Sequence, residues 1–320
     1  MKDLRWSYAI NQWRTVETDL ARLDQMESAF KTISVSGFEA IEINDNALGG
    51  HTIPAYFGSA ANFVAYLKNC GLSCVSSHFS GLAHGNPAAA GDHGRMVDSA
   101  ASTAAFLAEL GGSCLVMRPC GPYWKEAPIT EAKIGVIAEC CNKVGAATKA
   151  NGVVTAVHFD FLGGIRRAED IRTLLAMTDP DLVHVALDTA ELTIAGIDPV
   201  AFLREHGARV AHVQYKDAKV VDSFDDYARP NAEMEYWPAP IITAGADRGI
   251  DRWYYEMGTP GGLVDFPAVT AALTALDYAG WIVVESDQSP HVEESVMLNG
   301  WYKKQLLAGQ NALPAFGQRS

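Results

Sequence analysis

The feature that most constrains the fold of this chain is the alternation of short apolar segments with longer amphipathic ones, repeated along 320 residues. Nearly continuous short apolar runs are typical of strands covered on both faces. Strands are predicted at 5–11, 38–43, 73–78, 113–118, 153–160, 182–188, 209–215 and 281–285. Helices are predicted between and after them at 19–35, 57–70, 92–110, 129–150, 167–177, 198–206, 264–278 and 290–307.

Eight strand–helix units in one chain favour a (β/α)8 TIM barrel in the α/β class. Glycines follow several of the predicted helices, as expected at helix C-termini, at Gly37, Gly71, Gly111, Gly152, Gly207 and Gly280. An open doubly wound sheet is the alternative, but no Gly-x-Gly-x-x-Gly turn follows the first predicted strand. We therefore predict one barrel domain over residues 1–308, followed by a C-terminal tail at 309–320.

The charge and the cysteines narrow the class of protein. Lys and Arg number 25 against 38 Asp and Glu, so the formal net charge is −13, which disfavours nucleic acid and anionic membranes as partners. No apolar window reaches the roughly 20 residues of a membrane helix, and the N-terminus has no secretory apolar core. The six cysteines form no Cys-x-x-Cys pair, which favours buried free thiols and a cytoplasmic protein over disulfides or a metal cluster.

One connection is unusually long for a compact domain. Residues 218–262 separate the seventh strand from the seventh helix, and they contain the aromatic residues Tyr227, Tyr236, Trp237, Trp253, Tyr254 and Tyr255. A long aromatic connection predicts a lid over the site or a subunit interface. A loop packed only on itself is the alternative.

Polar side chains stand where the predicted strands end, and in a barrel these ends meet at one rim. The residues are Asn11, Glu42, His78, Arg118, His158, Asp160, Asp188, Gln214, Lys216, Asp217, Glu285 and Asp287. Four of them, on consecutive strands, can converge on one point: His158, Asp188, Gln214 and Glu285. An imidazole, an amide oxygen and two carboxylates suit a divalent cation such as Mn²⁺. A core histidine at 158, a helix cap at 188 and a lysine ion pair at 285 remain the structural alternatives.

Several stretches make the chain similar to the xylose-isomerase-like superfamily of sugar isomerases and epimerases, and within it to the inosose dehydratase branch. They are YAINQW, VHFDFLGG, TDPDLVHVALDTAEL, GIDP, RVAHVQYKD, MGTPGGLVDFPAV and GWIVVESDQSP. The resemblance covers nearly the whole chain and implies a (β/α)8 barrel with one divalent metal held by strands five to eight. It implies that Asp188 and Glu285 are metal carboxylates and that His158 fits the inosose dehydratases.

Three positions depart from the family's pattern. Gln214 stands where the strand-seven ligand is usually His, Glu191 where a substrate-contacting His is expected, and Asp160 where a second His often stands. These changes leave the substrate open. The superfamily also contains the large subunits of bacterial C-glycoside deglycosidases, which cleave 3-oxo-glycosides with a small β-rich partner subunit.

The reaction that the resemblance implies is proton abstraction beside a carbonyl, followed by loss of a β-substituent. The acid–base candidates are His158, Asp160, Glu191 and Lys216, although Lys216 in a surface salt bridge with Asp217 or Asp222 is an equal alternative. The candidates for substrate contact are His78, Arg118, Trp13 and Glu42, although core packing is the default interpretation of a tryptophan.

We therefore expect a metal-dependent lyase acting on a keto-sugar or glycoside, with Mn²⁺ as the expected ion and Co²⁺ or Mg²⁺ as alternatives. A sugar epimerase or isomerase is the second hypothesis. A non-catalytic sugar-binding scaffold subunit is the third, since Gln214 and Glu191 can also mark a decayed site. An oligomer, with or without a β-rich partner subunit, is expected.

Overall fold

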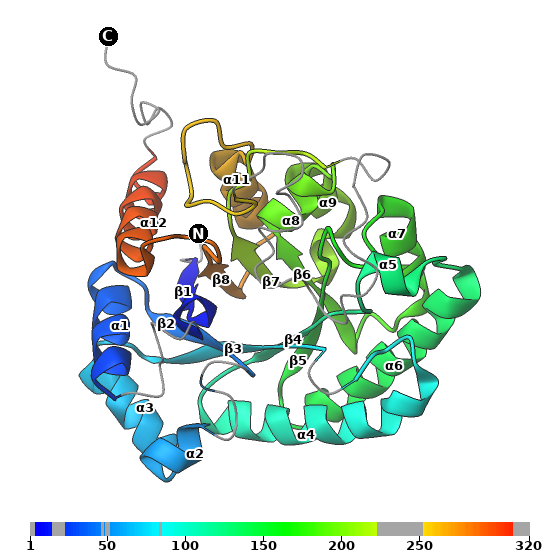
Figure 1. Ribbon diagram of the computed structural model, residues 1–320, viewed down its shortest axis with the longest axis horizontal. Coiled ribbons are helices and arrows are strands. Elements are labelled where there is room, and N and C mark those ends of the chain that lie inside the picture. The colour runs from blue at the N-terminus through cyan, green and yellow to red at the C-terminus, as the bar shows by residue number, and fades with distance from the viewer. Residues whose placement is uncertain are drawn as a thin grey trace.

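The computed structural model describes residues 4–14, 23–45, 48, 52–82, 85–222 and 252–309. Parallel strands in these residues close into a barrel in chain order, and β8 pairs with β1. The strands are β1 (Arg5–Ala9), β2 (Ala40–Asn44), β3 (Cys74–Gly81), β4 (Cys114–Met117), β5 (Val154–His158), β6 (Val183–Asp188), β7 (Val210–Tyr215) and β8 (Trp281–Val284). The predicted (β/α)8 architecture is confirmed, with the strands at the centre and the helices around them (Figure 1).

The helices that follow the strands lie close to their predicted ranges. They are α1 (Leu23–Val35), α3 (Ala60–Asn69), α4 (His93–Glu109), α6 (Glu131–Lys149), α7 (Ala168–Met177), α9 (Pro199–His206), α11 (Phe266–Ala275) and α12 (Val292–Leu307). Three short helices were not expected: α2 (Thr52–Phe57), α5 (Tyr123–Glu126) and α8 (Thr189–Ile194). In the described part of the chain, no helix is long and apolar enough to cross a membrane.

Because successive side chains on a strand point to opposite faces, polar residues at the strand ends can point into the barrel. Cys114, Val116, Ala156 and Ala186 form a buried cluster separate from the large core between strands and helices. Side chains two residues apart on a strand share a face. His158, two residues after Ala156, therefore points to the barrel interior at the carboxyl end of β5, and Asp188 follows Ala186 in the same way on β6.

Most of the glycines predicted to end helices adopt the left-handed backbone conformation. Gly37, Gly71, Gly111 and Gly152 adopt φ values between +72° and +88° after their helices, as predicted. Gly207 differs, because its φ is −54° and it begins a short 3-10 turn, η3 (Gly207–Arg209), rather than a left-handed cap.

The long connection is described only at its two ends. Residues 223–251, which include Tyr227, Tyr236 and Trp237, lie outside the described residues, and so do 310–320 of the predicted tail. In the C-terminal part of this connection, Trp253 and Tyr254 are buried and pack in one cluster with Phe161 and other residues near the carboxyl ends of β5 and β6. The aromatic residues of this end therefore belong to the barrel rim.

Candidate active site

A cavity of about 700 Å³ lies at the carboxyl ends of the strands. This volume is in the range of sites that hold drug-sized ligands. Its walls include charged and polar side chains from most strand ends: Asn11, Glu42, Arg118, His158, Asp160, Glu191, Lys216, Tyr254, Glu285 and Asp287. Eight of the twelve predicted rim residues therefore line one space, as expected for the catalytic end of such a barrel, whereas His78, Asp188, Gln214 and Asp217 do not.

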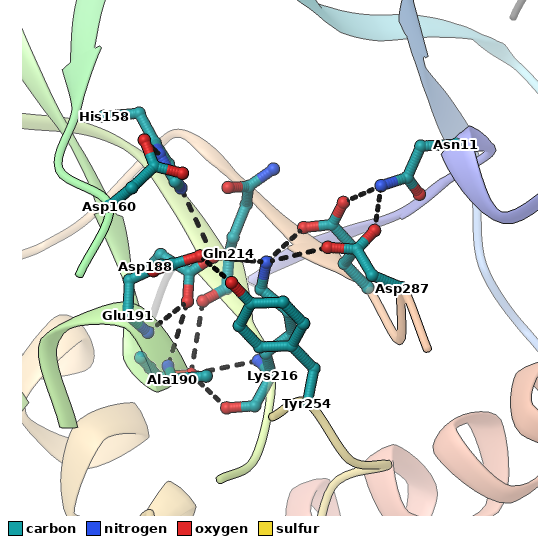
Figure 2. A network of polar contacts seen from close by, with 12 residues as sticks. Asn11, His158, Asp160, Asp188, Ala190, Glu191, Gln214, Lys216, Tyr254 and Asp287 are labelled. Carbon is teal, nitrogen blue, oxygen red and sulfur yellow. Dashed lines mark hydrogen bonds and ion pairs between the residues drawn. The ribbon is translucent and has the colours of Figure 1, made fainter. Parts of the chain in front are cut away.

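The ammonium group of Lys216 lies at the centre of the acidic side chains (Figure 2). Its Nζ is 2.8 Å from Glu285 Oε2, 3.0 Å from Asp188 Oδ2, 3.3 Å from Asp287 Oδ2 and 3.8 Å from Glu191 Oε1. Burial lowers the pKa of Lys216, but the charges of Asp188, Glu285 and Asp287 outweigh burial and raise it well above its ordinary value. Lys216 is a fixed, buried positive charge, so the surface salt-bridge interpretation is wrong.

Asp188 uses its two oxygens differently. Oδ1 accepts hydrogen bonds from the backbone N–H groups of Ala190 at 2.9 Å and Glu191 at 3.0 Å, and thereby caps α8. Oδ2 faces Lys216 and lies 3.4 Å from His158 Nε2. Burial raises the pKa of Asp188, but Lys216 and His158 outweigh it and lower the value. Asp188 therefore serves both as the N-cap of α8 and as a carboxylate of the site.

His158 is held between two carboxylates. Its Nδ1 lies 3.3 Å from Asp160 Oδ2, and Asp160 also accepts two hydrogen bonds from Arg118, at 2.8 Å from Nε and 3.1 Å from Nη2. Burial lowers the pKa of His158, but Asp160 and Asp188 outweigh it and raise the pKa to about 10. The structure thus places Asp160 and Arg118 beside the cavity as an ion pair that holds the imidazole.

Glu191 is a carboxylate suited to proton transfer near neutral pH. Tyr254 donates its hydroxyl to Oε1 at 2.6 Å, and the Phe161 N–H donates to Oε2 at 2.9 Å. Burial and the nearby charge of Asp160 raise the pKa of Glu191 to about 7. Sequence reasoning missed Tyr254 as a site residue. The crowding of aromatic residues in 218–262 was its only signal, and that signal did not single it out.

Gln214 and Glu42 form a buried pair at the base of the site. Gln214 Nε2 donates to Glu42 Oε1 at 2.8 Å, Ser77 donates to Glu42 Oε2 at 2.8 Å, and His212 Nε2 lies 3.0 Å from that oxygen. Both oxygens of Glu42 are thus engaged inside the barrel, although the residue lines the cavity. Gln214 Oε1 is buried and finds no hydrogen-bond donor among the residues that the structure describes.

On the opposite side, the amide of Asn11 donates to the carboxylates of Glu285 and Asp287. Burial and the charge of Asp287 raise the pKa of Glu285 well above its ordinary value. The crowding of Glu285 with Asp287 thus favours the protonated, neutral form of Glu285.

Two predicted substrate contacts lie elsewhere. Trp13 is 2% exposed, packs edge-on against Tyr8 at 6.4 Å between ring centroids, and does not line the cavity. The core-packing interpretation of Trp13 is therefore confirmed, and its candidacy as a substrate contact in this cavity is not. His78 is also buried behind the wall, where its Nε2 lies 2.8 Å from Oδ1 of Asp45, a lining residue.

The donor chemistry of the four predicted ligands can be tested for a divalent cation. In the described ranges, no three His, Cys, Asp or Glu side chains form a group placed to hold a metal. The buried Oε1 of Gln214 has no hydrogen-bond donor among the described residues, so it is an unused acceptor. The donor types of these four residues suit an oxygen-preferring divalent ion, but their arrangement does not fit one, because the Lys216 ammonium pairs with Asp188 and Glu285 instead.

Known proteins agree with this architecture. An inosose dehydratase from Clostridium tetani is 30% identical over 171 residues, which cover 53% of this chain and 52% of that protein. The matches to these curated relatives cover between 46% and 61% of the relatives' own length. A solved L-ribulose 3-epimerase has a TM-score of 0.70 at 17% identity, covering 99% of this chain and 100% of its own. IOLI protein, solved with a bound zinc atom, has a TM-score of 0.67 at 13% identity, covering 96% and 99%.

The two solved structures show the fold alone at such identities, but a family match extends further. Residues 30–305 match the family described as xylose isomerase-like TIM barrel. That match includes strands β2 to β8 and each of the four predicted ligand positions. The closed parallel barrel and the match over most of its length lead to one conclusion: the chain belongs to the xylose isomerase-like TIM barrel family.

Proposed function

We propose that the chain is a lyase that removes a proton beside the carbonyl of a polyhydroxylated ketone and then eliminates a β-substituent. The observation that carries this proposal is the Glu191 carboxylate, which lines the cavity with a pKa of about 7 and lies 3.8 Å from the Lys216 ammonium. A base near neutrality beside a fixed positive charge suits proton abstraction from a weak carbon acid. The similarity to inosose dehydratases supports an elimination.

The proposed steps use this chain's own side chains. Glu191 accepts the proton from the carbon beside the ketone, and the electron pair forms a carbon–carbon double bond as the bond to the β-oxygen breaks. Glu191, now protonated, returns its proton to the departing oxygen, so that water or an alcohol leaves. Tyr254 and the Phe161 N–H hold the carboxylate in place throughout. Lys216 offsets the negative charge that develops on the substrate.

The proposal retains a divalent cation with Mn²⁺ as the expected ion, for which His158, Asp188, Gln214 and Glu285 would have to rearrange around Lys216 in order to act as ligands. When bound, such an ion supplies Lewis-acid stabilisation of the developing negative charge on the ketone oxygen. Asp160 orients His158 for this role by contacting its Nδ1, which leaves Nε2 directed towards Asp188.

The size of the cavity bears on the substrate. A volume of about 700 Å³ accommodates a sugar ring together with a second group. The proposed substrates are therefore an inosose or a 3-oxo-glycoside whose aglycone is the leaving group. For the glycoside, the proposal includes a small β-rich partner subunit and an oligomeric enzyme.

The test is an assay of the pure chain against inososes and oxidised glycosides, with and without Mn²⁺ and with the products of neighbouring genes. A new enone chromophore, a released aglycone or a dehydrated product supports elimination. Solvent deuterium at an inverted carbon, without loss of a group, would replace the lyase by an epimerase. Glu191→Gln should lower turnover by about 10²–10⁴-fold, whereas Glu205→Gln, at an exposed ion pair with Arg172, should leave it unchanged.

A further inference from the structure

Asp217 follows Lys216 just beyond the end of β7, and its carboxylate has no part in the steps proposed above. Its side chain is 1% exposed and does not line the cavity, whereas that of Lys216 does. Burying a carboxylate is costly unless donors satisfy it. The donors that Asp217 finds are backbone N–H groups, and most of its contacts lie on the segment that carries Tyr254.

The backbone of Asp217 pairs with that segment in both directions. Its N–H donates to the Tyr255 carbonyl at 3.0 Å, and its carbonyl accepts the Tyr255 N–H at 2.9 Å. The two bonds form an antiparallel bridge outside the strands of the barrel. Tyr254, which precedes Tyr255, is thereby placed beside the end of β7.

The carboxylate of Asp217 holds a later part of the same segment. Its Oδ1 accepts the N–H groups of Ala218 at 2.9 Å and Val264 at 3.2 Å. The chain passes so close to this side chain that a Cβ added at Gly262 would lie 2.1 Å from Oδ2. Residues 255–264 are therefore fixed to Asp217 at both ends, by its backbone at 255 and by its side chain at 264.

The two residues next to these contacts act on the proposed base. Lys216 Nζ lies 3.8 Å from Glu191 Oε1, and the Tyr254 hydroxyl donates to the same oxygen at 2.6 Å. The ammonium is also 4.2 Å from the centroid of the Tyr254 ring (Figure 2). How these groups meet on Glu191 depends on how residues 254–264 are aligned with the end of β7.

We infer that Asp217 is a positioning residue for the elimination: it holds residues 255–264 against the end of β7 and thereby keeps Tyr254 on the proposed base. This inference rests on the proposed function, in which Glu191 is that base. A small displacement of a group that orients a reacting side chain is enough to lower a rate by an order of magnitude or more.

Other contacts of the segment limit what loss of the carboxylate does. The Trp253 N–H donates to Gln288 Oε1 at 2.6 Å, and the Met257 N–H donates to Asn299 Oδ1 at 2.8 Å. Both contacts are independent of the Asp217 side chain. Removing the carboxylate should therefore loosen the segment without releasing it from the barrel.

The first test is hydrogen exchange, followed by mass spectrometry of the peptides that contain Tyr255 and Val264. Asp217→Ala should raise their exchange rates about tenfold or more over wild type, because buried N–H groups lose their acceptor. Asp198→Ala is the matched control. The Oδ1 of Asp198 also accepts two backbone N–H groups, but it caps α9 outside the cavity, so this variant should leave both rates unchanged.

The second test asks whether the loosening reaches the base. At a pH where Glu191 is ionised, Asp217→Ala should lower kcat about tenfold and change KM little, because Asp217 does not line the cavity. Tyr254→Phe should lower kcat by a similar factor, and Asp217→Ala added to it should cost little more, because both changes remove the same contact. A merely structural role would make the two losses additive.

Unchanged exchange at Tyr255 in Asp217→Ala, or additive losses of kcat, would overturn the inference and leave the proposed function intact. Absence of elimination by the wild-type protein would overturn the proposed function, and the inference with it.

Gly262→Ala covers the case in which Asp217→Ala does not fold. The added Cβ displaces the Asp217 carboxylate without removing it, so this variant should show faster exchange at Val264 and a lower kcat. A folded Gly262→Ala variant with wild-type exchange and wild-type kcat would overturn the inference.

Discussion

The double role of Asp188 allows one prediction that separates folding from chemistry. Asp188→Asn keeps an oxygen that can accept the Ala190 and Glu191 N–H groups, but it removes the charge that faces Lys216. Asp188→Ala removes both. The asparagine should keep its oxygen towards the helix, because the flipped amide would point its N–H₂ at two backbone donors.

The magnitudes follow from the contacts. Losing the cap costs about 1 kcal/mol, which is the expected difference in unfolding free energy between Asp188→Asn and Asp188→Ala. Removing one partner of a buried ion pair costs about 3–5 kcal/mol in general. Because Lys216 retains Glu285 at 2.8 Å and Asp287 at 3.3 Å, we expect Asp188→Asn to lose about 2–3 kcal/mol.

The assay combines urea unfolding in chelator with Mn²⁺ titration and turnover. Asp198 provides a matched control pair, since its Oδ1 caps α9 through Val200 and Ala201 outside the cavity. Asp198→Asn should resemble wild type, and Asp198→Ala should lose about 1 kcal/mol with full activity. If Asp188→Asn keeps wild-type turnover and Mn²⁺ affinity, Asp188 is only a cap and the site argument fails.

Four further outcomes are expected. The kcat/KM of wild type should rise with pH up to about 7 and then level off, because Glu191 must lose its proton to act as a base. Glu191→Gln should lower the rate by about 10²–10⁴-fold and remove this rise of kcat/KM with pH. A carboxyl whose folded-state pKa is raised from 4.5 to about 7 stabilises the native state below pH 4.5 and loses that contribution as pH rises through about 7. Glu191→Gln should therefore lose less stability than wild type between pH 5 and 8 in thermal unfolding, and an equal loss would contradict the raised pKa. Tyr254→Phe removes the hydrogen bond to Glu191 and should move the acid limb upward by about one pH unit, whereas an unmoved limb would show that the phenol does not act on the base. Asp160→Asn leaves Arg118 and His158 without their shared carboxylate and should weaken Mn²⁺ binding about 10-fold or more in titration. An unchanged affinity would show that Asp160 does not position His158.

Much of the barrel could be predicted from local patterns. The apolar runs locate the eight strands to within a few residues because a strand buried on both faces requires such a run. The period of two along a strand then determines that His158 and Asp188 share the interior face at the carboxyl ends of β5 and β6. Their convergence could therefore be expected before any coordinates.

Other features depend on contacts between distant segments. No local pattern shows that Trp13 packs against Tyr8 in the core. Likewise, no local pattern shows that Gln214 and Ser77 donate hydrogen bonds to Glu42. Tyr254 reaches Glu191 from the far end of a connection whose path no periodicity specifies. A loop has no repeating backbone hydrogen bonds to set its register, so its contacts are decided by packing.

The sequence by itself determined the barrel, the order of its strands and the residue types at its carboxyl rim, because these follow from hydrophobic periodicity along the chain. Only the tertiary structure decided that Lys216 stands among four carboxylates and that Glu191 titrates near neutrality. The physical reason is that charge interactions depend on distances of a few ångströms and on burial, and both are created only when all strands close into one ring.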